Sequence, residues 1–108
     1  MHIQQLIFAK ETAMTFKELS QIRDKVDCVF VDNSATGLKI LELCQRNGIK
    51  STDLAEILGF TGPQAVYNWS EGKSKPTLDN LLKISHLFGT DVNDIIQVSY
   101  KNQNRNIV

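Results

Sequence analysis

The feature that most constrains the fold is a run of small and apolar residues in the middle of the chain. Ala55 and Leu58 recur at helical spacing, and Gly59 then interrupts the pattern. A small residue such as Ala55 lets two helices cross closely, and Gly59 tolerates a tight turn between them. Val66 and Trp69 are three residues apart, which places both on one face of a second helix. The run therefore predicts two short helices joined by a tight turn, with the outer face of the second helix free.

Capping residues and helical periodicity predict further helices on both sides of this pair. The Thr15-Phe16-Lys17-Glu18 segment forms a capping-box signal, while Ser51, Thr77 and Asp91 are candidate N-caps. Glycines 48, 59 and 89 are expected to end helices. The expected helices cover about 16–25, 36–47, 51–58, 63–70 and 77–88, with a short last helix to about residue 96.

A β-branched and aromatic run at 28–31 predicts a short strand, which must pair because a lone strand leaves its backbone groups unsatisfied. We expect it to pair either with the apolar segment His2–Lys10 or with the same strand of a second subunit. From Gln97 the sequence turns polar and reads as a tail. The expected organisation is an N-terminal extension at 1–33, a helical domain at 34–96 and a polar tail at 97–108.

The helical region resembles the phage-repressor and Cro type of helix-turn-helix protein, often called the XRE or lambda repressor-like family. The resemblance covers about 60 of the 108 residues. It rests on Thr36-Gly37-x-x-Ile40-x-x-Leu43, Asn47-Gly48-Ile49, Leu54-Ala55-x-x-Leu58-Gly59-Phe60, Val66-x-x-Trp69-x-x-Gly72-Lys73-x-x-Pro76-x-Leu78-x-x-Leu81-x-x-Ile84 and Leu87-Phe88-Gly89. Between Gly59 and Val66 the chain has one residue more than is usual, and Gly59-Phe60-x-x-Pro63-Gln64-Ala65 is similar to a subset of the family.

The resemblance implies a mainly α fold. We expect a five-helix repressor-like DNA-binding domain with a short N-terminal extension of one helix and possibly a short strand. It further implies double-stranded DNA as the partner, usually bound by a homodimer, with the helix at 63–70 in the major groove.

The charge balance tempers this expectation. The whole chain carries no formal net charge, and positions 33 to 96 contain six basic and seven acidic residues. Any positive face must therefore be local, and non-specific affinity for DNA should be modest because it scales with the phosphates neutralised.

Helix geometry selects the residues that would reach base edges. With Val66 and Trp69 turned inward, the outer and flanking faces carry Gln64, Ala65 and Asn68. Amide side chains can bond adenine at N6 and N7, and a methyl group can pack on the thymine methyl. We therefore expect these three side chains to contact bases.

Contacts to the DNA backbone are expected from three places. The amides at Ser51 and Thr52 open a helix N-terminus, which attracts anions, although Asp53 and Glu56 lie nearby and oppose DNA. Thr61 and Tyr67 belong to the turn and the second helix, and Lys73 and Lys75 follow that helix in a loop. The complete set of expected backbone contacts is Ser51, Thr52, Thr61, Tyr67, Lys73 and Lys75.

Other classes of function find little support in the residues. Cys28, Cys44, His2 and His86 are too scattered for a metal site, so we expect no metal and no cofactor, and no small-molecule ligand is evident. No nucleophile–base pair or phosphate-cradling motif indicates an enzyme. The first ten residues lack a secretory leader, and no apolar run approaches the ~20 residues of a membrane span, so a cytoplasmic protein is expected.

Two functions follow as hypotheses. The first is a sequence-specific transcriptional regulator, expected to be a repressor that acts by occupying its site. Its dimerisation would use the N-terminal helix and strand or the last helix. The alternative is an antitoxin-like or adaptor protein, in which the same scaffold mainly binds another protein.

Overall fold

The computed structural model describes residues 13–101, and the chain forms two compact units. The larger unit is Val31–Ser99, and the smaller combines Met1–Phe30 with Tyr100–Val108. The apolar segment His2–Lys10 and the tail after Lys101 lie outside the described residues. No helix within 13–101 is long and apolar enough to cross a membrane.

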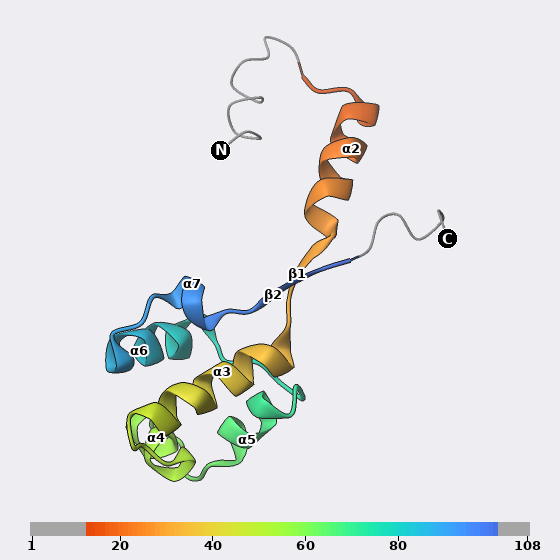
Figure 1. Cartoon of the computed structure of the whole chain (residues 1–108). Coiled ribbons are helices and arrows are strands. Elements are labelled where there is room, and N and C mark those ends of the chain that lie inside the picture. Colours follow the sequence, from red (N-terminus) through yellow and green to blue (C-terminus); the bar gives the residue numbers. More distant parts are fainter. Residues whose placement is uncertain (1–12, 102–108) are drawn as a thin grey trace. The chain divides into compact units, whose positions relative to one another are not determined.

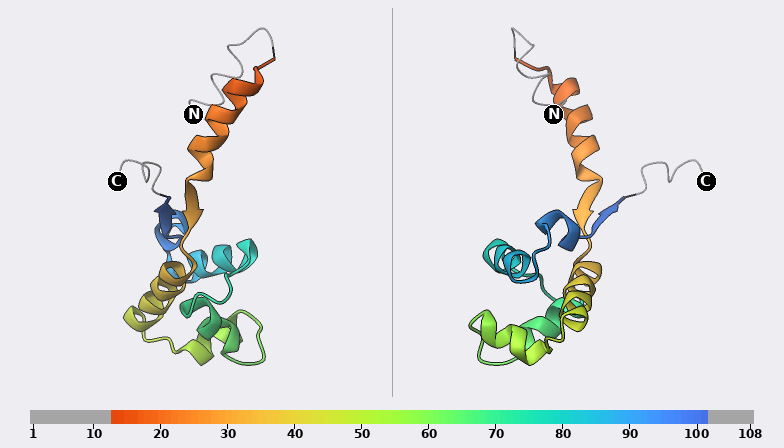
Figure 2. Two further views of the ribbon diagram at one scale, coloured as in Figure 1. Left: turned by 90° about the vertical axis from the view of Figure 1, so that its right-hand side faces the viewer. Right: turned by 60° about the vertical axis from the view of Figure 1, so that its left-hand side comes forward.

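The larger unit contains five helices, as expected. They are α3 (Asn33–Arg46), α4 (Ser51–Ile57), α5 (Gln64–Ser70), α6 (Leu78–Phe88) and α7 (Val92–Ile95). Helix α3 contacts α4, α5 and α7, and its contact with α5 is the most extensive in the fold. In the views of Figures 1 and 2, α4 and α5 form the lower end of this unit and α6 and α7 its upper end.

The core of the larger unit consists of the apolar residues that helical spacing turns inward. Val66 and Trp69 are only 1% and 4% exposed, which confirms the inner face predicted for the second helix of the pair. The other buried apolar residues are Ile40, Leu43, Cys44, Leu54, Ala55, Leu58, Leu81, Ile84 and Ile95.

Helices α3 and α5 approach each other most closely at Gly37. A Cβ atom built on Gly37 would lie 2.0 Å from the carbonyl oxygen of Trp69 and 2.6 Å from the backbone nitrogen of Ser70. Both of these are backbone atoms, so a side-chain rotation cannot relieve the overlap. Glycine is therefore required at this crossing, and the backbone of α5 lies directly against α3.

Glycines with positive φ also shape the ends of the helix pair. Gly59 (φ 86°) and Gly72 (φ 74°) follow α4 and α5 in the left-handed region, and Gly59 ends its helix as predicted. At both ends the backbone N–H groups of the glycine and of the residue after it donate to carbonyls in the last turn of the helix. These carbonyls would otherwise lack partners. These bonds fix the direction in which the chain leaves each helix.

Two predicted helix starts are wrong by one residue. Ser51 is the first residue of α4 and Lys50 is its N-cap, while Asp53 accepts a hydrogen bond from the Lys50 N–H at 2.9 Å. Pro63 is the N-cap of α5 and not its first residue, and its carbonyl accepts from the Tyr67 N–H. The predicted N-caps Thr77 and Asp91 are confirmed by their side-chain bonds to Asn80 N and Asn93 N.

The smaller unit contains α2 (Phe16–Asp27), which begins with the expected capping box. The Thr15 hydroxyl accepts from the Glu18 N–H at 3.2 Å, and the Glu18 carboxylate accepts from the Thr15 N–H at 2.9 Å. None of the residues of α2 is buried, and Phe16 is 81% exposed. Its apolar stripe is therefore left uncovered by the described residues.

A short strand follows α2, but its partner differs from both that we expected. Strand β1 (Val29–Val31) forms a two-stranded sheet with β2 (Val98–Tyr100), which lies in the segment expected to be a polar tail. The Asp32 N–H donates to the Gln97 carbonyl and the Lys101 N–H donates to the Cys28 carbonyl, a pattern that makes the pair antiparallel.

The residue before β2 is bonded to the beginning of α3 through Thr36. The Thr36 side chain is buried, and its hydroxyl oxygen accepts from the Gln97 N–H at 2.9 Å. The Ser99 hydroxyl lies 3.3 Å from the Asp32 carboxylate. Polar groups at the beginning of α3 thus hold a chain segment more than sixty residues away in sequence.

We predict that Gly37→Ala destabilises the protein by roughly 1–3 kcal/mol or more, because the added methyl group overlaps the backbone of α5. The change would appear as a lower midpoint in chemical or thermal unfolding. Gly62→Ala is the matched control, because no atom lies within 4 Å of its added Cβ, and it should change stability by less than about 1 kcal/mol. Equal losses for the two variants would contradict the close crossing.

Candidate nucleic-acid interface

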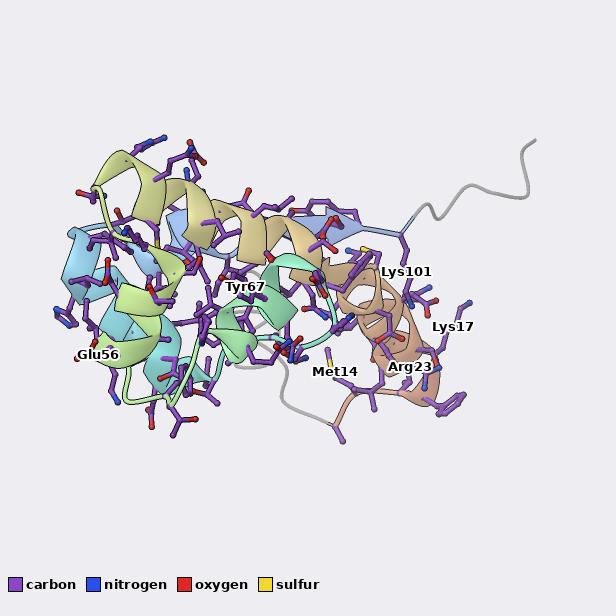
Figure 3. All side chains as sticks on the ribbon, turned by 90° about the horizontal axis from the view of Figure 1, so that it is seen from below. Met14, Lys17, Arg23, Glu56, Tyr67 and Lys101 are labelled. Carbon is purple, nitrogen blue, oxygen red and sulfur yellow. The ribbon has the colours of Figure 1, made fainter. Side chains whose placement is uncertain are left out.

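Helices α4 and α5 and the turn between them present one continuous face of the larger unit. Figure 3, seen from below, shows both helices toward the viewer, with Glu56 labelled on α4 and Tyr67 on α5. A hollow of about 280 Å³ lies between α4 and the turn that leads into α5. Thr52 and Thr61, two of the expected phosphate contacts, line this hollow together with Glu56.

Packing behind the turn sets the orientation of α5. The rings of Phe60 and Trp69 meet edge to face, with their centroids 5.9 Å apart and their planes at 70°. Phe60 follows Gly59 directly, so this contact ties the turn to the inner face of α5. With Trp69 held in this way, the residues on the opposite side of α5 are turned to solvent.

The three expected base-contacting residues differ in their accessibility. Gln64 is exposed and Asn68 is half-buried, and their amides are bonded to each other, with Gln64 Nε2 donating to Asn68 Oδ1 at 3.0 Å. Ala65 is half-buried and packs against the core, so it is turned more toward the protein than we expected. Tyr67 is 42% exposed, and within residues 13–101 its ring does not stack on another aromatic ring.

The loop after α5 is fixed to that helix at its first residues. The Lys73 N–H donates to the Asn68 carbonyl at 2.9 Å, and the Gly72 N–H donates to the Trp69 carbonyl at 3.1 Å. The backbone of Lys73 therefore has a defined position relative to Asn68. Lys75, also exposed, precedes the buried Pro76.

Lys73 is not a free cation at this face, which the sequence analysis did not foresee. Its Nζ lies 2.9 Å from Glu71 Oε1, and both side chains are largely exposed. The neighbouring Glu71 carboxylate raises the pKa of the Lys73 ammonium above its usual value, so this side chain stays charged at neutral pH. Their spacing at positions 71 and 73 in a turn was the available signal for this ion pair.

The N-terminus of α4 combines the expected amides with a carboxylate. Ser51 is half-buried and Thr52 is exposed, so both lie near the surface. Asp53 bonds the Lys50 N–H at this same end of the helix, and Glu56 lies one turn further along. A phosphate approaching the amides would therefore meet two acidic side chains, as the sequence indicated.

Reactive side chains are sparse around this face. Burial raises the pKa of the Cys44 thiol, which keeps it protonated at neutral pH. Cys44 is buried in the core, and His86 is exposed on α6. Within residues 13–101, no group of three His, Cys, Asp or Glu side chains is placed to hold a metal ion.

Solved structures with a similar fold include an enzyme and a DNA-binding domain. The hydroxypropylphosphonic acid epoxidase from S. wedmorenis matches with a TM-score of 0.54 and 22% identity, over 61% of this chain and 35% of that one. A structure titled FeII HppE also has a TM-score of 0.54 and 22% identity, over 61% of this chain and 34% of that one. The present chain thus spans about a third of the length of these proteins, and the likeness concerns the fold of the shared part.

The DNA-binding domain of BldD matches over nearly its whole length. Its TM-score is 0.52 at 16% identity, and the match covers 61% of this chain and 94% of that domain. A search of curated proteins found no match. The helix-turn-helix family model matches residues 40–95, which is more than half of the chain. The chain therefore belongs to the helix-turn-helix proteins of the phage-repressor and Cro type, the XRE family.

Proposed function

We propose that the protein is a sequence-specific DNA-binding transcriptional regulator that reads the major groove with α5. The observation that carries this proposal is that α5 has one buried apolar face and one polar outer face. Val66 and Trp69 are buried, while the opposite face presents the amides of Gln64 and Asn68. A helix anchored on one side, with hydrogen-bonding groups on the other, suits the reading of base edges.

The proposed contacts divide into those that read bases and those that hold the backbone. Asn68 and Gln64 contact base edges, with Ala65 beside them against a thymine methyl. Phosphates and sugars are met by the remaining candidates, which are Ser51, Thr52, Thr61, Tyr67, Lys73 and Lys75. This division makes α5 the source of specificity and its flanks the source of general affinity.

We further propose repression by occupancy as the mode of action, with a homodimer on two half-sites. The dimer would form in the cytoplasm through the smaller unit. Helix α2 has only 12 residues, which is short for a stable isolated helix in water, and it buries none of them. A two-stranded sheet is likewise marginal on its own, and Val29, Phe30 and Tyr100 are all exposed. A second copy of the same unit would cover these apolar residues.

Asn68→Ala should weaken the sequence-specific shift of promoter DNA. The substitution removes one amide on the outer face of α5 and leaves the buried residues unchanged. Binding to a specific fragment should weaken about tenfold, while weak binding to unrelated DNA persists. The measurement is a mobility shift on fragments that include the protein's own promoter, and wild-type protein that shifts none of them at low salt would refute the proposed function.

Lys73→Gln and Lys75→Gln should each reduce the salt dependence of DNA binding. Each lysine that neutralises a phosphate contributes about one to the slope of log affinity against log salt concentration. The slope should fall by about one for Lys75→Gln and by less for Lys73→Gln, whose ammonium is already paired with Glu71, with little change in sequence preference. Lys83→Gln, an exposed lysine on α6, is the control and should leave the slope unchanged.

Leu19→Glu should convert the dimer into a monomer, because it places a charge in the exposed apolar stripe of α2. Gln21→Glu adds the same charge to another exposed position of the same helix and should leave the dimer intact. Sedimentation velocity of the full chain over a range of concentrations measures the effect. Wild-type protein that stays monomeric throughout, or a Leu19→Glu variant that stays dimeric, would contradict this interface.

A further inference from the structure

The hydrogen bond between Gln64 and Asn68 constrains how α5 can read a base. The two residues are one helical turn apart, a spacing at which side chains on a helix surface meet. Gln64 Nε2 donates to Asn68 Oδ1 at 3.0 Å, so the two amides form one unit. Each amide therefore restricts the hydrogen bonds available to the other.

The bond couples the orientations of the two amides. An asparagine amide that rotates by half a turn exchanges its oxygen and its nitrogen, and because Gln64 carries both a donor and an acceptor, Asn68 can reverse and keep the bond only if the Gln64 amide turns with it. Because Gln64 supplies a donor, Asn68 Oδ1 is held toward the N-terminal side of α5. Asn68 Nδ2 is then directed away from Gln64 as a donor. The amide oxygen has a second lone pair, so it can still accept one further hydrogen bond.

We propose that Gln64 is a positioning residue that presets the Asn68 amide to accept adenine and to reject guanine. Adenine offers N7 as an acceptor and N6–H₂ as a donor in the major groove, which matches the donor and acceptor that Asn68 presents. Guanine offers N7 and O6, which are both acceptors, so in this arrangement of the amide pair O6 would face Oδ1 without a hydrogen between them. This inference rests on the proposed function, and it assigns Gln64 an action through Asn68 in addition to any contact of its own.

Substitutions of Gln64 separate the hydrogen bond from the bulk of the side chain. Gln64→Met keeps a similar length but removes the donor, which frees the Asn68 amide to rotate. Gln64→Lys keeps a donor and should preserve the orientation. Gln64→Glu at neutral pH offers only acceptors, so Asn68 should turn its Nδ2 toward the carboxylate. Gln64 is exposed, so none of these variants disturbs the core.

The experiment has two stages and uses the full chain. Bound sequences are first selected from random DNA with the wild type and with Asn68→Ala, and the position whose preference depends on Asn68 is identified. Affinities are then measured for the selected site carrying adenine or guanine at that position. Since the readout is the ratio of the two affinities, general effects of charge on DNA binding cancel.

The wild type should favour adenine over guanine by about tenfold, the discrimination typical of a good amide–base pair. Gln64→Met should lower this ratio at least about threefold, Gln64→Lys should retain it, and Gln64→Glu should remove it. The double variant Gln64→Met/Asn68→Ala should show the same ratio as Asn68→Ala alone, because Gln64 acts through Asn68.

Each other outcome has a definite meaning. If the wild type enriches no sequence, the proposed function itself fails. If it enriches a sequence but no position depends on Asn68, or that position is not adenine, the present inference is wrong while DNA binding stands. An adenine preference that survives in Gln64→Met would equally overturn the inference, because the hydrogen bond would then be dispensable.

Discussion

The contact between α3 and α5 at Gly37 is the constraint on which the rest of the larger unit depends. It places the backbone of α5 directly against α3, without an intervening side chain. Since Trp69 is also held edge to face by Phe60, the rotation of α5 about its own axis is fixed from two directions. The outward orientation of Gln64 and Asn68 is a consequence of these contacts and not of any interaction made by the two amides with the core.

Charge contributes less to this face than is usual for a protein that binds DNA. The chain has no formal net charge, Asp53 and Glu56 lie on α4, and Glu71 pairs with Lys73. Non-specific affinity grows with the number of phosphates neutralised, so a neutral surface keeps it low. Useful regulation depends on the ratio of specific to non-specific binding, and a low background improves that ratio. Specificity then has to come from hydrogen bonds made by uncharged side chains.

Much of the larger unit could be predicted because its signals are local. The periodic apolar residues, the glycines with positive φ and the caps at Thr15, Thr77 and Asp91 each act within about one helical turn. The starts of α4 and α5 differ from the predicted ones by one residue, because local signals define a helix boundary only to within a residue or two. The family model match at residues 40–95 agrees with the resemblance drawn from the same local patterns.

The features that escaped prediction depend on contacts between distant residues or between side chains. Strand β2 has only three residues inside a polar segment, and it is defined by pairing with β1 and by the bond from Gln97 to Thr36. Val98 and Tyr100 favour a strand, but three residues are too few to predict one, and the partner strand lies more than sixty residues away. The amide pair of α5 is different, since the spacing of Gln64 and Asn68 already permitted it. The sequence could not show whether the two amides bond to each other or stay independent, because that depends on their side-chain rotamers.

A preset amide pair and a two-fold dimer would reinforce each other. Discrimination at one half-site by about tenfold becomes about a hundredfold when two identical copies of α5 read two half-sites together, because the free energies of separate positions add. A monomer would lack the multiplied discrimination of two half-sites. With no net charge, it would also lack a strong electrostatic attraction to DNA that could compensate. In the proposed dimer, the exposed apolar residues of α2 and of the sheet would therefore bear on specificity as well as on stability. Without a second subunit, the modest discrimination of one uncharged helix would have to select a site unaided.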